Sequence, residues 1–122
     1  MKEETKELLD RTFQFGVNCL LFISSLPHSD KYRVPKHQLA KSSTSIGSNY
    51  EEAQAAESKK DFIHKIGIVS KESRESHYWL RVIKAITNGA VDSNRLESLL
   101  SEAAEFKKIF ISIKLTAQQN KN

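Results

Sequence analysis

Cationic side chains recur along one line of the segment 59–88, which the spacing of its apolar residues predicts to be a helix. Cations on one line can each contact a successive phosphate, and a tyrosine ring among them can stack on an unpaired base. The line consists of Lys60, His64, Lys71, Arg74, Tyr78 and Arg81, with Lys84 close by. It predicts a nucleic-acid-binding face. The alternative is a solvated helix face whose cations pair with acids such as Glu75.

Two carboxylates, Glu72 and Glu75, lie about one helical turn apart beside Trp79, between the cationic line and the apolar face. Partial burial beside an indole would raise the pKa of a carboxyl group, and perturbed groups mark functional sites. Such residues more often form hydrogen bonds across a helix interface, and we favour this structural role. Suitable polar partners follow one face of the preceding segment, at Gln38, Ser42, Ser45, Asn49 and Glu52.

The sequence contains no arrangement of residues typical of a metal site or a catalytic site. A di-iron bundle needs Glu-x-x-His pairs, which the chain lacks, and its four histidines do not have the spacing of zinc ligands. No histidine falls on the serine-rich face of segment 36–57, so a serine nucleophile there would have no base. Gly47 and Gly67 are isolated and form no phosphate-binding loop. We expect no catalytic residue, no metal and no cofactor, and therefore no enzyme.

Composition favours one small helical domain. The 122 residues fit a single domain, and the 39% that are hydrophobic supply one core. Four glycines and two prolines leave little material for turns, and no segment alternates as a strand would. A net charge of +4 permits a polyanionic partner without requiring one. The expected fold class is all-α.

Three features of the sequence favour a cytoplasmic location without membrane contact. The lone Cys19 suits a reducing compartment. The start, MKEETKE, is charged in both signs and lacks the apolar region of a signal peptide. The longest apolar run, residues 19–23, is much shorter than the ~20 residues that a membrane span needs.

Apolar spacing predicts four helices, at about residues 3–26, 36–57, 59–88 and 94–118. The third has a regular four-three heptad spacing, which predicts the face that packs on neighbouring helices. Its heptad residues are Phe62, Ile66, Val69, Ser73, Ser76, Leu80, Ile83 and Thr87. The polar segment 27–34 is expected to be a loop, followed by Pro35 in the first turn of the second helix, where its missing N–H costs nothing. Ser58 and Asp61 resemble a capping box for the third helix, which Gly89 ends. Four long helices with short connections form an antiparallel, up-and-down four-helix bundle.

The first predicted helix has a wider apolar face than a helix on a bundle surface usually shows. One row of residues passes through Phe13 and Leu20, and the adjacent row through Phe15, Cys19 and Phe22. Two interpretations of this width stay open. Either the helix is deeply seated in the monomer, or Phe15, Cys19 and Phe22 belong to an interface with a second subunit.

The segment 38–80 combines several short motifs. They are Gln38-Leu39, Ser42, Ser45-Ile46-Gly47, Asn49, Glu52-Ala53, Ser58-Lys59-Lys60-Asp61-Phe62, Lys71-Glu72, Glu75 and Tyr78-Trp79-Leu80. In this combination the chain resembles the bacterial four-helix bundle family, also called the S23 or 23S rRNA-intervening-sequence protein family. One departure is Ser48-Asn49-Tyr50, where small residues are expected before the Asn. Outside 38–80 only the helix pattern and length agree with the family.

The resemblance implies a four-helix bundle for which no enzymatic activity is established. Related proteins form five-fold homo-oligomers, and one relative, the accessory protein of diversity-generating retroelements, works with a reverse transcriptase and nucleic acid. A similar chain would use its first helix in a subunit interface. The family's name as a ribosomal protein does not imply a place in the ribosome.

We therefore expect a non-enzymatic, homo-oligomeric bundle that binds nucleic acid, specifically RNA, through the cations of segment 59–88. The alternative is a protein-interaction scaffold that does not bind nucleic acid directly. A third hypothesis is a small-molecule site lined by Ser42, Ser45, Asn49 and Glu52.

Overall fold

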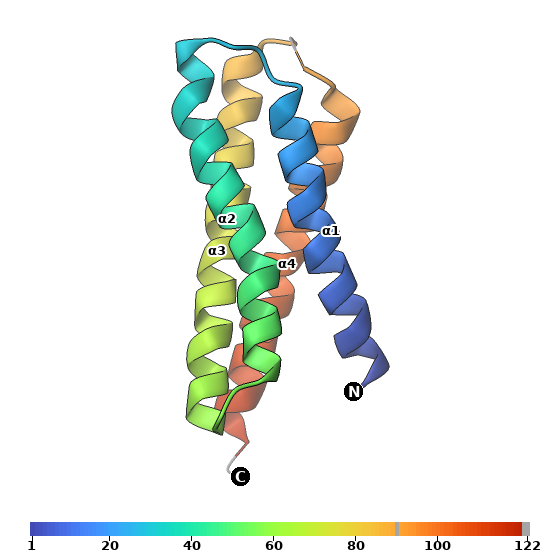
Figure 1. Cartoon of the computed structure of the whole chain (residues 1–122), viewed down its shortest axis with the longest axis vertical. Coiled ribbons are helices and arrows are strands. Elements are labelled where there is room, and N and C mark those ends of the chain that lie inside the picture. The colour runs from blue at the N-terminus through green and yellow to red at the C-terminus, as the bar shows by residue number, and fades with distance from the viewer. Residues whose placement is uncertain (90, 121–122) are drawn as a thin grey trace.

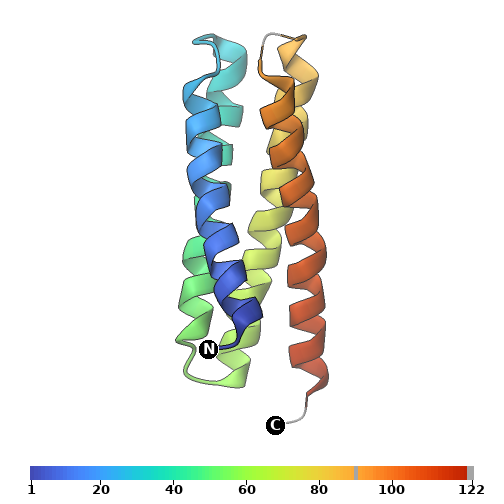
Figure 2. The same cartoon turned by 90° about the vertical axis from the view of Figure 1, so that its right-hand side faces the viewer.

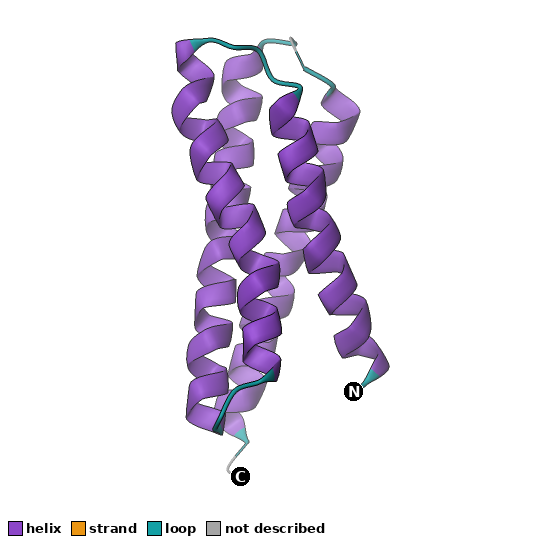
Figure 3. Cartoon of the chain, in the orientation of Figure 1, coloured by secondary structure: helices purple, strands orange, loops and turns teal. Residues whose placement is uncertain are grey.

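The computed structural model describes residues 1–89 and 91–120, and most of them lie in four long helices. These are α1 (Glu3–Ser24), α2 (Asp30–Gln54), α3 (Lys59–Thr87) and α4 (Ser93–Gln119). The helices run alternately up and down, and each lies beside the next, with α1 returning to the side of α4 (Figures 1 and 2). The described residues contain helices and loops without strands (Figure 3). The predicted all-α, up-and-down four-helix bundle is confirmed.

The structure corrects the predicted beginning of the second helix. α2 begins at Asp30, so most of the predicted loop 27–34 is helical, and Pro35 lies inside the helix rather than in its first turn. A proline there is unfavourable because it has no N–H to bond the carbonyl one turn earlier. Burial compensates for this loss, since Pro35 and Tyr32 are both buried, and the Tyr32 ring is 1% exposed. The polar composition of this turn had suggested a loop.

Side-chain caps fix where α3 and α4 begin. The Ser58 hydroxyl accepts a hydrogen bond from the Asp61 backbone N–H at 3.0 Å, as the predicted capping box requires. Asp61 in turn accepts from the N–H of Glu57 at 3.2 Å. At the other end of α3, Asn88 takes the left-handed conformation and Gly89 follows with a positive φ. The Asp92 carboxylate caps α4 by accepting from two backbone N–H groups.

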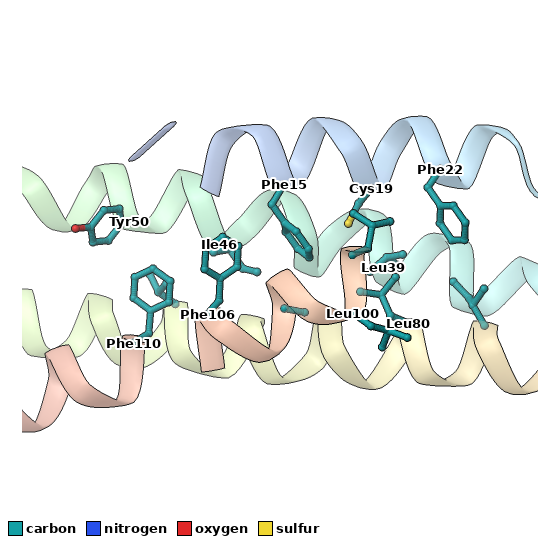
Figure 4. Packing of buried hydrophobic residues seen from close by; sticks show 14 of the residues in the cluster. Phe15, Cys19, Phe22, Leu39, Ile46, Tyr50, Leu80, Leu100, Phe106 and Phe110 are labelled. Carbon is teal, nitrogen blue, oxygen red and sulfur yellow. The ribbon is translucent and has the colours of Figure 1, made fainter. Parts of the chain in front are cut away.

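A continuous apolar core fills the space between the four helices (Figure 4). The Phe15 ring of α1 meets the Phe106 ring of α4 edge to face, with 5.3 Å between centroids. Farther along, Tyr50 of α2 meets Phe110 of α4 at the same separation. The heptad residues of α3 that the sequence predicted as core are buried, apart from Phe62 at the end, which is half-buried. They are Ile66, Val69, Ser73, Ser76, Leu80, Ile83 and Thr87.

The structure also settles which apolar row of α1 faces inward. Phe15, Cys19 and Phe22 lie in the core of the single chain, and none is more than 2% exposed. A second subunit could not contact these buried side chains. The prediction that Phe15, Cys19 and Phe22 form a subunit interface is therefore wrong, and they belong to the core of the single chain. In the adjacent row Phe13 is 63% exposed and Leu20 is 44% exposed, whereas Gly16 between them is buried against α2.

Small residues bring α1 and α2 close together. A Cβ atom at position 47 would lie 3.2 Å from the backbone C and O atoms of Thr12, and one at position 16 would lie 3.4 Å from the carbonyl oxygen of Ser43. The contact at position 47 is tighter than an ordinary one, so a side chain there would displace the neighbouring helix, whereas a Cβ at position 16 would make an ordinary contact. The clustered small residues of α2, which are poor helix formers, therefore have a packing role.

Candidate nucleic-acid interface

The orientation of α3 decides which of its side chains meet solvent. Its heptad residues face the other three helices, so the opposite side of the helix is turned outward. All seven residues of the predicted nucleic-acid-binding line are exposed. They are Lys60, His64, Lys71, Arg74, Tyr78, Arg81 and Lys84.

Ion pairing distinguishes these cations from one another. Lys84 pairs with Glu97 of α4, with 2.6 Å between Nζ and Oε1. Within residues 1–89 and 91–120, no ion pair involves Lys71, Arg74 or Arg81. The alternative interpretation, in which the cations of this face form ion pairs with acidic residues, thus applies, among the described residues, only to Lys84 at one end of the line. Elsewhere the cations are available to a ligand.

A groove lies on this face between α2 and α3, with a volume of about 400 Å³. Its lining combines residues from the cationic line with residues from the polar face of α2 and the acidic pair. The lining residues are Gln38, Lys71, Arg74, Glu75, Tyr78 and Trp79. Lys60, His64, Arg81 and Lys84 lie outside the groove lining, farther along α3. Two separate sequence predictions therefore meet in one place.

Aromatic rings form part of the groove wall. Tyr78 and Trp79 meet edge to face with 5.0 Å between ring centroids, and Tyr78 is 49% exposed. The guanidinium carbon of Arg81 lies 5.6 Å from the centroid of the Tyr78 ring, a cation–π arrangement. An exposed ring beside cations is the combination that single-stranded nucleic acids use for stacking and phosphate contact.

The acidic pair is half-buried next to the groove. Partial burial raises the pKa of Glu72, and repulsion from Glu75 adds to this rise. Lys71 and Lys41 act in the opposite direction, which places the Lys41 ammonium of α2 near this carboxylate. Lys41 was absent from the sequence-based site, because its proximity arises only when α2 packs on α3.

The polar row of α2 divides into structural and accessible members. Ser42 is buried and its hydroxyl accepts a hydrogen bond from the Ser76 hydroxyl of α3 at 2.9 Å. Asn49 donates to the carbonyl oxygen of Ser45 within α2 at 2.8 Å. Glu52 is exposed beyond them. Gln38 alone of this row lines the groove.

Trp79 is the groove residue that the sequence-based site omitted. It follows Tyr78 directly, yet it sits at the edge of the core, half-buried against the apolar cluster. Its position next to the heptad residue Leu80 was the available signal, because a residue beside a core position lies at the rim of the helix interface.

Metal-binding groups and membrane-spanning helices would each bear on the class of protein. Among the described residues, no three side chains of His, Cys, Asp or Glu come together as a metal-binding group. In the same part of the chain, no helix is both long enough and apolar enough to cross a membrane.

Comparison with known proteins gives the family. The model for 23S rRNA-intervening sequence proteins matches residues 4–112, which include all of α2 and α3 and most of α1 and α4. The chain belongs to this family. The resemblance noted over residues 38–80 is thereby confirmed and extended along the bundle.

A solved structure of the same family has the same fold. It is the crystal structure of a protein of unknown function from the S23 ribosomal protein family of Bacteroides thetaiotaomicron. The two chains are 34% identical with a TM-score of 0.76, and the alignment covers 88% of this chain and 97% of that one. A comparison with curated proteins finds no match.

Proposed function

We propose that this member of the 23S rRNA-intervening sequence protein family binds RNA through the outer face of α3, without catalysing a reaction. The observation that carries the proposal is the groove in which Lys71 and Arg74 lie exposed, without ion pairs in the described structure, beside the rings of Tyr78 and Trp79. Lysine and arginine supply phosphate contacts, and the rings supply stacking surfaces for unpaired bases.

Backbone contacts of this kind make binding depend strongly on salt. Each phosphate that a cation neutralises releases a counterion, so affinity falls as the salt concentration rises. Arg81 and Lys60, exposed farther along α3, extend the positive line beyond the groove. A strand that follows α3 would therefore meet successive cations.

Reversing two charges in the groove tests the proposal. The double variant Lys71→Glu/Arg74→Glu should lose nearly all retention of a single-stranded RNA in a filter-binding assay. The matched control Lys2→Glu/Lys6→Glu makes the same change in net charge at the exposed start of α1 and should retain most binding. Equal binding by both variants and the unaltered protein would contradict the proposal.

We also propose that the protein works as a homo-oligomer, assembled through the exposed apolar residues of α1. Phe13 (63% exposed), Leu20 (44%) and Leu21 (57%) lie on one side of that helix, and exposed apolar residues in such a cluster mark protein interfaces. The five-fold assembly of related proteins belongs to this proposal. On α4, Ile111 and Leu115 form a second exposed apolar pair, one turn apart. Two different apolar patches would suit a ring, in which each subunit meets its neighbours through unlike surfaces.

Light scattering tests the assembly. The unaltered protein should show a multiple of the 13.9 kDa mass of one chain at micromolar concentration. The variant Phe13→Glu/Leu21→Glu should show the mass of one chain with its helical circular dichroism intact, because both side chains lie outside the core. The control Val34→Glu alters an exposed apolar residue of α2 and should leave the assembly in place. A single-chain mass for the unaltered protein would rule the assembly out.

A further inference from the structure

The groove contains a group that phosphate contacts do not explain. Glu75 lines the same groove as Lys71 and Arg74, and a carboxylate there repels the phosphates that these cations attract. No ion pair within residues 1–89 and 91–120 involves Glu75, although Lys71 lies one turn earlier on the same helix. A carboxylate can only accept hydrogen bonds when ionised. The Glu75 carboxylate would therefore suit a ligand that carries N–H donors between its negatively charged phosphates.

Nucleobases provide such donors. In single-stranded RNA their hydrogen-bonding edges are free, and their faces stack on aromatic side chains. The groove supplies both complements, with the rings of Tyr78 and Trp79 in its wall and Glu75 beside them. Its volume of about 400 Å³ is within the range of pockets that hold small ligands.

We propose that this groove holds one unpaired guanine base of the bound RNA, stacked on the aromatic wall, with Glu75 accepting hydrogen bonds from its N1–H and N2 amino group. Lys71 and Arg74 contact the flanking phosphates. The inference rests on the RNA binding proposed above and adds to it a base preference.

Guanine is singled out by the arrangement of its donors. Its Watson–Crick edge carries two neighbouring donors, which match the two oxygens of one carboxylate. Adenine and cytosine each present one amino donor next to a ring nitrogen that only accepts. Uracil presents a single N–H between two carbonyl oxygens. A carboxylate facing any of these three bases meets at least one acceptor, and the two acceptors repel each other.

Gln38 supports the same base from the opposite wall. Its side chain lines the groove from α2, whereas the other lining residues belong to α3. An amide N–H can donate to the guanine O6, which lies next to N1–H on the same edge. The base would then be held by both helices, with Glu75 of α3 accepting from N1–H and the N2 amino group and Gln38 of α2 donating to O6.

Trp79 supplies a direct measurement of this binding, because it is the one tryptophan of the chain. Uridine oligonucleotides of equal length, with a single central G, A or C or none, are titrated against the protein. The oligonucleotide with G should quench Trp79 fluorescence and bind about tenfold more tightly than the all-uridine one, since a bidentate base contact contributes about 1–3 kcal/mol. Equal affinities for all four oligonucleotides would overturn the inference.

Glu75→Gln tests the group that reads the base. The amide has one acceptor in place of two, so the ratio of affinities for the G-containing and all-uridine oligonucleotides should fall from about ten to near one. Affinity for all-uridine RNA should rise, because a negative charge has left the groove. The control Glu4→Gln removes a carboxylate from the exposed start of α1 and should keep the tenfold ratio. A Glu75→Gln variant that still prefers G would overturn the role of Glu75.

The same measurements distinguish a failure of the RNA-binding proposal from a failure of the guanine site alone. If none of the oligonucleotides is retained on a filter at low salt, the RNA-binding function and the guanine site are both wrong. If all are retained equally and Lys71→Glu/Arg74→Glu abolishes retention, RNA binding holds and the guanine site alone is wrong.

Discussion

The two sides of α1 are held in different ways. Toward α2 the helices approach closely over Gly16 and Gly47, and at Gly47 even an added Cβ atom would press on the Thr12 backbone. Toward α4 the helices diverge toward the start of α1 (Figure 1), and a groove of about 410 Å³, lined mostly by polar side chains, lies between them. α2, which forms one wall of the candidate RNA groove, is fixed by backbone proximity, whereas α4 is joined to α1 by side chains.

Side-chain contacts across the α1–α4 side are few but specific. Phe106 meets Phe15 edge to face, and the Arg11 guanidinium lies 5.4 Å from the Phe106 ring centroid. Arg11 also forms two hydrogen bonds with Glu102, at 2.6 and 3.0 Å. Because this pair is partly exposed, solvent weakens it, and we expect the aromatic contact to dominate.

The largest effect is expected from removing that aromatic contact. Phe106→Ala should lower the free energy of unfolding by about 3–5 kcal/mol, because a ring that is fully buried between α1 and α4 leaves a cavity. Chemical denaturation followed by circular dichroism measures the change. The exposed residue Val34 of α2 lies outside the core and the proposed assembly surface, and the control Val34→Ala should change stability by less than about 1 kcal/mol. Similar losses at both positions would contradict the described core.

A methyl group added between α1 and α2 should have the next largest effect. Gly47→Ala places its Cβ 3.2 Å from Thr12 backbone atoms, which cannot move without shifting α1, so we expect a loss of about 1–3 kcal/mol. Gly67→Ala is the matched control on α3. There the added Cβ would meet the mobile end of Lys114 at 3.3 Å, and the better helix propensity of alanine should stabilise the protein by about 0.5–1 kcal/mol. Effects of the same sign at both glycines would remove the distinction between them.

The ion pair on the α1–α4 side should contribute least. A double-mutant cycle with Arg11→Ala and Glu102→Ala should give a coupling energy of about 1 kcal/mol or less, falling as salt is added. Coupling above about 2 kcal/mol would mean that charge, and not the aromatic contact, joins these helices.

Cys19 offers a second measure of the same comparison. The thiol is fully buried, and burial raises its pKa to about 12, so at pH 8 it should react with an alkylating reagent only when the structure opens. Gly47→Ala should accelerate this reaction, and Arg11→Ala should accelerate it less. Mass spectrometry of the intact protein over time measures both rates. Rapid alkylation of the unaltered protein would show that Cys19 is not enclosed.

The periodic spacing of apolar residues was enough to predict a helix and its buried face where that spacing is regular. The four-three spacing of Ile66, Val69, Leu80 and Ile83 identified both α3 and its buried face, because a single apolar row leaves one orientation available. α1 carried two apolar rows, and a helix pattern cannot say which of two rows its neighbours cover. Burial of Phe15 instead of Phe13 is decided by where α4 supplies Phe106.

The candidate site was predictable where it lies on one helix and obscure where it spans two. Lys71, Arg74 and Tyr78 share a face of α3, and spacing along that helix was enough to group them. Gln38 and Lys41 belong to α2, and their positions relative to α3 depend on how closely the two helices pack. Spacing along α2 could not distinguish the buried members of its polar row from the accessible ones. Packing on α3 buries Ser42 and leaves Gln38 in the groove.

Pro35 has a consequence for how the molecule moves. Because proline has no N–H, the carbonyl of Lys31 receives no helical hydrogen bond from position 35, and the first turn of α2 is joined to the rest by fewer backbone bonds. That turn is held chiefly by the buried ring of Tyr32, whose hydroxyl has no hydrogen-bond partner in the described structure. Opening of that turn therefore requires the Tyr32 ring to leave the core, so the exchange of its amide protons with solvent should report how often this ring is released.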